Sequence, residues 1–95
     1  MRILHLTPYY APAYAFGGVV RSVEGMARAL AEGDREDLQF MAHRLAGGLS
    51  AMGLHWGAGQ GRALERDALH ADPAALEARI RGLREHLARV RIATA

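Results

Sequence analysis

The chain has 95 residues, 51% of them hydrophobic, and a formal net charge of +2. This length and composition indicate one globular domain with a modest core and exclude a disordered chain. No apolar run reaches the roughly 18 residues of a membrane span. All twelve basic residues are arginine, but acids interleave them, as in "ALEARIRGLREHLARVR". We therefore expect no nucleic-acid or membrane binding. With no cysteine and no signal peptide, a cytoplasmic protein is expected.

Residues 1–17 do not follow the pattern of the rest of the chain. "RILHLT" alternates like a short strand, Pro8 and Pro12 interrupt a helix, and "FGG" is typical of a flexible elbow. The sequence predicts an irregular or short-strand N-terminal arm. Its aromatic residues could pack on the rest of the domain. Alternatively, its strand could pair with a second copy and form a homodimer.

The first two predicted helices are joined by a Gly-Asp turn. After Gly18, the residues Val19, Val23, Met26 and Leu30 form one apolar stripe. Gly33 is typical of the position after a helix end, and Asp34 of an N-cap. The second helix begins near Arg35, and Gly53 ends it. Its inner side carries Leu38, Met41, Ala42, Leu45, Leu49 and Met52, and its opposite side carries Gln39, His43, Gly47 and Ser50.

Two further helices complete the plan. The third runs from about His55 to Ala68, with Trp56 expected to anchor it in the core. The fourth has Asp72 as N-cap and Pro73 at its first position. Its seam consists of Leu76, Ile80, Leu83, Leu87 and Val90. Helices with short turns favour antiparallel neighbours, so we predict an all-α, antiparallel four-helix bundle over residues 18–92.

His43 is the candidate for a chemical role. A histidine that exchanges a phosphoryl group with another protein must be exposed and have small neighbours. Its Nδ1 must be held by an acceptor, so that Nε2 carries the free lone pair. Gly47 lies one turn after His43 on the same face and gives such clearance. A surface histidine without a role is the alternative. The histidine spacings do not predict a metal site.

The segment "AHRLAGGLSAMG" places Leu45, Gly47 and Gly53 two, four and ten residues after His43. It resembles the phosphoacceptor signature of histidine-containing phosphotransfer (HPt) domains. "ALAEGDREDLQFMAH" before it and "GRALERDAL" after it are also similar to that family, so the resemblance covers about residues 19–90.

The HPt resemblance implies a phosphoryl carrier that is not itself an enzyme. His43 would accept the group from a receiver aspartate or a histidine kinase, including a hybrid kinase, and pass it to a response-regulator receiver domain. No cofactor is implied, because the Mg²⁺ ion would belong to the receiver. Glu65, or less readily Gln60, would accept from Nδ1. The family's usual lysine is replaced by Ala46, for which Arg44 or Arg62 could substitute.

Residues 1–32 carry a second resemblance. "MRILHLTPYYAPAYAFGGVVRSVEGMARALAE" looks like the start of a GT-B glycosyltransferase of group 1 (family 4). In that case Gly17 and Gly18 would approach a sugar ligand with backbone amides. The second strand expected after this start is replaced by a helical pattern. An N-terminal glycosyltransferase fragment and a helical interaction module without phosphotransfer are therefore the alternatives to an HPt domain.

Overall fold

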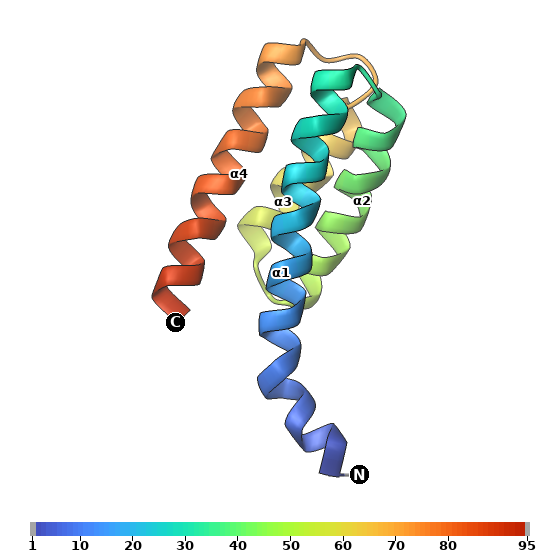
Figure 1. Cartoon of the computed structure of the whole chain (residues 1–95). Coiled ribbons are helices and arrows are strands. Elements are labelled where there is room, and N and C mark those ends of the chain that lie inside the picture. Colours follow the sequence, from blue (N-terminus) through green and yellow to red (C-terminus); the bar gives the residue numbers. More distant parts are fainter. Residues whose placement is uncertain (1, 95) are drawn as a thin grey trace.

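The computed structural model describes the side chains of residues 17–90, and its first and last helices have bounds at Arg2 and Thr94. The helices are α1 (Arg2–Glu32), α2 (Arg35–Ala51), α3 (His55–Asp67) and α4 (Pro73–Thr94). They form a ring in chain order, in which α1 packs on α2, α2 on α3, α3 on α4 and α4 on α1 (Figure 1). This confirms the predicted all-α four-helix bundle. The arm expected over residues 1–17, with its dimer contacts, lies outside the residues described with side chains, apart from Gly17.

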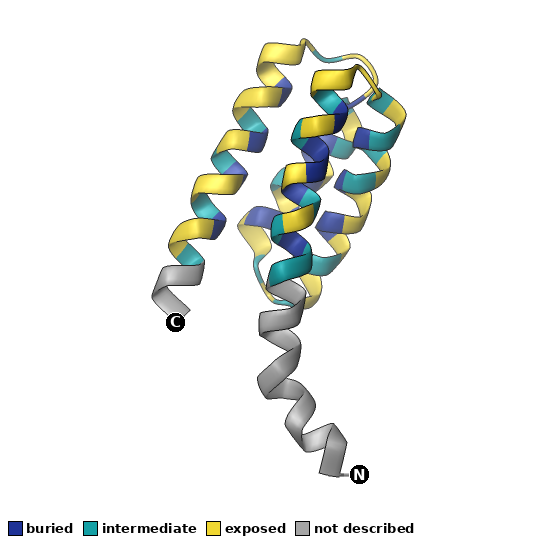
Figure 2. Ribbon diagram, in the orientation of Figure 1, coloured by how far each residue is buried: buried dark blue, intermediate teal, exposed yellow. Residues whose placement is uncertain are grey.

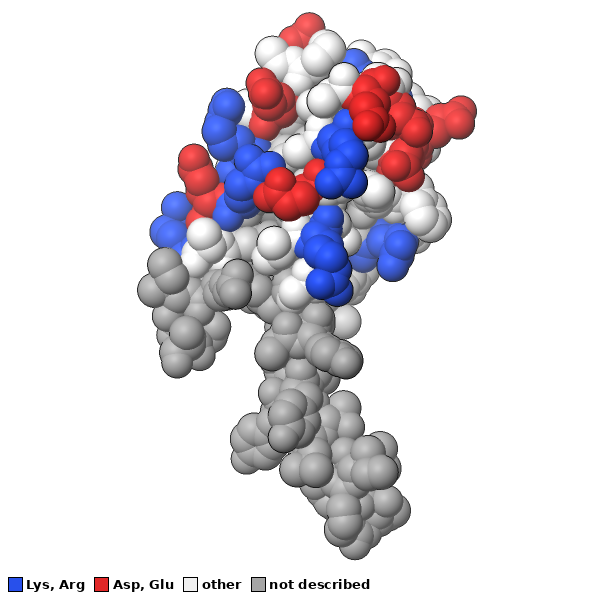
Figure 3. Space-filling model, in the orientation of Figure 1, with Lys and Arg blue, Asp and Glu red and all other residues white. Residues whose placement is uncertain are grey.

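Each helix contributes one apolar stripe to a common core (Figure 2). The stripes follow the predicted spacing, and within residues 17–90 no polar or charged residue is buried. The large side chains at the centre are Val23, Met26, Leu38, Leu45, Leu49, Leu64, Leu76 and Leu83. On the face shown in Figure 3, arginine and acidic side chains are interleaved over α1 and α4, as the charge pattern predicts.

The predicted helix ends are confirmed by their hydrogen bonds. Gly33 and Gly53 have φ angles of 77° and 78°, a region that glycine enters without steric cost. At the first of these ends, the Asp34 amide donates to the Ala29 carbonyl at 2.8 Å, while the Gly33 amide donates to Leu30 at 3.1 Å. This pair of bonds is a Schellman motif, which satisfies carbonyls that the helix leaves free.

Two aspartates begin helices as expected. The Asp34 side chain accepts from the Asp37 amide at 3.1 Å, and the Asp72 side chain accepts from the Ala74 amide at 3.1 Å. These bonds satisfy amides in the first turns of α2 and α4. At the C-terminal end of α3, Nη1 of Arg35 donates to the backbone carbonyls of Ala68 and Ala71 at 2.9 and 3.0 Å. Arg35 therefore joins the start of α2 to the end of α3.

The expectation that Trp56 anchors the core is wrong. Trp56 is 51% exposed, and its ring lies against the half-buried His86 of α4, with 4.4 Å between the ring centroids. Gly57 and Ala58 face the core instead. A Cβ atom on Gly57 would lie only 2.9 Å from Cδ1 of Leu49. The space beneath this turn of α3 is already filled by leucine, so the indole lies outside it.

Candidate functional site

His43 lies at the middle of α2, on the side that faces away from the core. Its neighbours Ala42 and Leu45 are buried, and they fix the rotation of the helix. The His43 side chain is 71% exposed. The core stripe of α2 therefore presents the imidazole ring to any protein that approaches this face.

The Nδ1 atom of His43 lies 3.0 Å from Oε2 of Glu65, which is on α3 and is 36% exposed at its side chain. A carboxylate can only accept a hydrogen bond, so this contact places the ring hydrogen on Nδ1. In the neutral imidazole, Nε2 then carries the free lone pair. Glu65 thus selects the imidazole tautomer in which Nε2 can act as a nucleophile.

A second bond holds the two helices in register at this point. The Gln39 side-chain amide donates to the backbone carbonyl of Glu65 at 3.2 Å. Gln39 precedes His43 by one turn of α2, so one helix contacts both the main chain and the side chain of Glu65. Two residues of α2 therefore hold Glu65: Gln39 binds its backbone carbonyl, and His43 binds its carboxylate.

The glycines next to His43 leave open space. A Cβ atom built on Gly47 would meet no other atom within 4 Å, and the same is true of Gly48. Packing inside the domain therefore gives no reason for glycine at position 47. Gly61 on α3 is the contrasting case, because its Cβ would lie 3.1 Å from Cβ and 3.2 Å from Cα of Ala46. There an added Cβ would crowd the backbone of α2, so the two helices lie close together.

Residues 19–93 match the family model of the Hpt domain. The chain belongs to the Hpt family. Hpt domains are histidine phosphotransfer modules of phosphorelays, and they carry phosphoryl groups without being autonomous enzymes. Phosphorelay proteins such as receiver domains or kinases are the partners of this family. No curated protein and no solved structure matches the chain significantly. Nothing in these comparisons supports the glycosyltransferase resemblance.

The other residues predicted for the Hpt site fall in different places. Gln60 does not reach His43, because its Oε1 accepts from Nη1 of Arg79 on α4 at 3.4 Å. It lies on another side of α3 from Glu65. The Arg44 guanidinium lies 5.7 Å from the centroid of the Phe40 ring. Arg62 is exposed on α3, one turn before Glu65, and Ala46 is buried between α2 and α3.

Phe40 is a surface feature that the sequence reasoning missed. It is 57% exposed and precedes His43 by three residues, so both side chains occupy one face of α2. Aromatic side chains, phenylalanine among them, are enriched at protein interfaces relative to the rest of the surface. The helical spacing from His43 could have identified it, because a phenylalanine on the outer face has no place in the core stripe.

An ion pair lies beside Glu65 at the end of α3. Nε and Nη2 of Arg66 donate to the Asp67 carboxylate at 3.0 and 3.1 Å. The hydrogen bonds from Arg66 lower the pKa of Asp67, and the same bonds raise the pKa of Arg66. The charge of Arg66 is thus directed to its neighbour rather than to His43.

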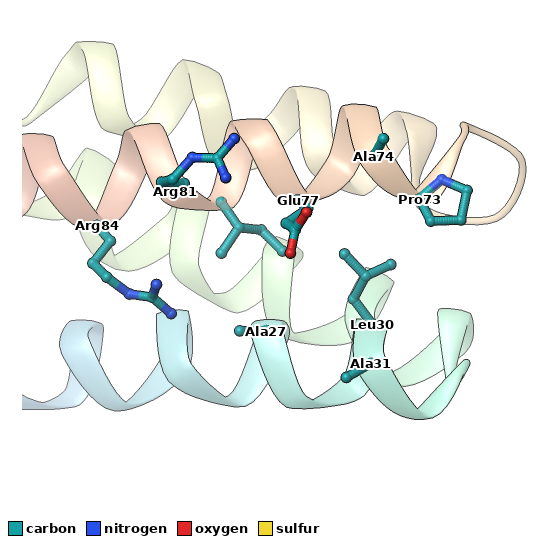
Figure 4. Close-up of a pocket in the computed structure, with 9 residues that line it drawn as sticks. Ala27, Leu30, Ala31, Pro73, Ala74, Glu77, Arg81 and Arg84 are labelled. Atoms are coloured by element: carbon teal, nitrogen blue, oxygen red, sulfur yellow. The ribbon is translucent and has the colours of Figure 1, made fainter.

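A groove of about 420 Å³ lies on another side of the helix bundle, between α1 and α4 (Figure 4). Ala27, Leu30 and Ile80 give it an apolar floor, and Glu77 and Arg81 lie along it. Arg84 crosses it to form two hydrogen bonds of 3.0 Å with Glu24. His43 lies on the α2–α3 side, away from this groove, on a surface that leaves its side chain 71% exposed. Such a surface suits a protein partner better than a small ligand.

The described part of the chain contains no group of three or more His, Cys, Asp or Glu side chains that could together hold a metal ion. None of the described helices has the length and apolar character needed to cross a membrane.

Proposed function

We propose that His43 is the residue that carries the phosphoryl group in this Hpt domain. Its Nε2 lone pair attacks phosphorus in the aspartyl phosphate of a receiver domain or the phosphohistidine of a kinase. The bond from Nε2 to phosphorus forms as the bond from phosphorus to the donor's oxygen or nitrogen breaks. The donor group leaves with that bond's electron pair. The reverse sequence passes the group to an aspartate of the next receiver domain.

The observation that supports this role is the exposed His43 with its Nδ1 atom 3.0 Å from Oε2 of Glu65. When Nε2 binds phosphorus while Nδ1 keeps its hydrogen, the ring becomes positively charged. A carboxylate hydrogen-bonded to Nδ1 stabilises that charge and orients the ring. The Mg²⁺ ion that the transfer uses would be held by the receiver domain.

The partner would dock on the face formed by α2 and α3. Gly47 leaves room next to the imidazole, and Phe40 offers an exposed apolar contact one turn before it. Protein interfaces are commonly enriched in aromatic side chains. A receiver domain or a hybrid histidine kinase is the partner that this surface would accept.

A phosphotransfer assay tests the proposal. The full chain is incubated with phosphorylated receiver domains or with phosphoramidate, and an acid-labile, base-stable phosphoryl group is followed by mass spectrometry. We expect a label on the wild type and on His70→Gln, which removes another exposed histidine, but not on His43→Gln. A folded wild-type chain that takes no label from any donor would refute the proposal and favour a helical interaction module without phosphotransfer.

A further inference from the structure

We infer that Arg62 supplies the positive charge that binds the phosphoryl group on His43. This inference rests on the proposed role of His43 as the carrier. Phosphoryl oxygens are bound well by guanidinium groups, which can donate two parallel hydrogen bonds. The site therefore needs a cation within reach of Nε2, and the fold determines which arginine provides it.

Position 46 cannot provide the cation in this chain. Ala46 is 5% exposed and faces Gly61 of α3. A Cβ on Gly61 would lie 3.2 Å from both Cα and the backbone nitrogen of Ala46. Ala46 and Gly61 thus form a contact between α2 and α3, so a residue elsewhere must supply the positive charge.

The antiparallel register places Arg62 on the stretch of α3 that runs alongside the His43 turn of α2. Ala46 is opposite Gly61, and His43 is opposite Glu65, so the α3 residues between Gly61 and Glu65 run alongside the turn of α2 that carries the histidine. Arg62 and Glu65 are three residues apart, which puts their Cβ atoms about 5–6 Å apart on neighbouring positions of the helix surface. By this register Arg62 lies level with the stretch of α2 between His43 and Gly47, whereas Glu65 contacts Nδ1.

The space that the Arg62 side chain must cross is open. Apart from Gly47 itself, its two chain neighbours and the nearby backbone of α2, no atom lies within 4 Å of the position of a Gly47 Cβ, and Arg62 itself is exposed. An arginine side chain is long and flexible enough to fold over this gap toward a group on Nε2. The glycine therefore gives access to an internal cation as well as to a partner protein.

The neighbouring arginines are already engaged. The Arg44 guanidinium lies over the ring of Phe40, and Arg66 donates two hydrogen bonds to Asp67. Within residues 17–90, Arg62 has no hydrogen bond, ion pair or ring contact. An exposed cation with no other partner can bind the phosphoryl oxygens without losing an existing contact.

The test compares Arg62→Ala, Arg62→Lys and the control Arg44→Ala in the full chain. The first measurement is the rate of labelling by phosphoramidate, without any protein partner. The second is the lifetime of the isolated phosphohistidine, together with its phosphorus NMR shift. For Arg62→Ala we expect labelling about tenfold slower, as for the loss of a charged hydrogen bond. We also expect the lifetime and the phosphorus NMR shift of the phosphohistidine to change in Arg62→Ala. Arg62→Lys should recover these properties in part, and Arg44→Ala should change the labelling rate by less than about twofold.

The outcomes separate this inference from the role of His43. If the wild type is labelled on His43 and Arg62→Ala behaves like Arg44→Ala, the inference about Arg62 is overturned and the carrier role stands. If Arg62→Ala slows transfer from a receiver domain but not from phosphoramidate, Arg62 contacts the partner, and the inference is again overturned. If the wild type takes no label, both proposals fail. Circular dichroism of each variant verifies that the helices are retained.

Discussion

The Nδ1 atom of His43 on α2 lies 3.0 Å from Oε2 of Glu65 on α3. Both side chains are at the surface, yet the positions they occupy are fixed by buried neighbours, Leu45 on one helix and Leu64 on the other. The bond therefore depends on how the two helices are packed. We therefore expect a change at Glu65 to alter the properties of His43 without altering the fold.

We expect Glu65→Ala to slow labelling of His43 by about tenfold, the lower range for removing a group that orients a histidine from its second nitrogen. Glu65→Gln should cost less, because an amide oxygen still accepts from Nδ1 but carries no charge. The initial rate of labelling by phosphoramidate measures both effects. Gln60→Ala is the control, since Gln60 contacts Arg79 rather than His43. Wild-type labelling by a folded Glu65→Ala variant would contradict this prediction.

The exposed glycines of α2 allow stability and transfer to be separated. Gly47→Ala and Gly48→Ala should each raise the free energy of unfolding by about 0.5–1 kcal/mol, because alanine favours the helix interior and both positions are open. Only Gly47→Ala should slow transfer from a phosphorylated receiver domain, and Gly47→Leu should slow it further. Urea unfolding and receiver-to-chain transfer rates test this pair. Equal transfer rates for the variants at positions 47 and 48 would show that clearance at Gly47 has no role.

Features that depend on neighbouring residues could be predicted from the sequence. The glycines with positive φ at positions 33 and 53, the caps Asp34 and Asp72, and the apolar stripes are signals read within a few residues of the chain. His43 could be placed on an exposed face for the same reason. These signals suffice for the number, the order and the inner sides of the helices.

Contacts between helices were harder to predict because they depend on register. Glu65 and Gln60 are both polar residues of α3, and only the close approach of Ala46 to Gly61 decides which one faces His43. Residue type alone favours a core position for Trp56, but Leu49 fills that space. The exposed position of Phe40 follows from its spacing of three residues from His43.

The close approach of α2 and α3 predicts opposite effects for two glycines of α3. Gly61→Ala should lower the free energy of unfolding by about 1–3 kcal/mol, because its new Cβ meets backbone atoms of Ala46 that cannot rotate away. Gly59→Ala should raise that free energy by about 0.5–1 kcal/mol, since its Cβ enters open space. Urea unfolding of both variants gives the comparison. If both variants gain stability, the helices are not as close at Gly61 as the structure has them.

Arg35 is expected to stabilise the bundle from the first turn of α2. Its Nη1 atom donates to the Ala68 and Ala71 carbonyls, which follow the last turn of α3, where a positive charge is also favoured by the helix dipole. Arg35→Met removes both bonds while keeping an aliphatic chain, so we expect a loss of about 1–3 kcal/mol in the free energy of unfolding. Arg28→Met, at an exposed position of α1, is the control and should change it by less than about 0.5 kcal/mol. The midpoint of urea unfolding measures the stability of both variants, provided that the slope of the free energy against urea concentration is unchanged. Equal midpoints would mean that water replaces the guanidinium at these carbonyls without cost, and that the core alone holds the end of α3 on α2.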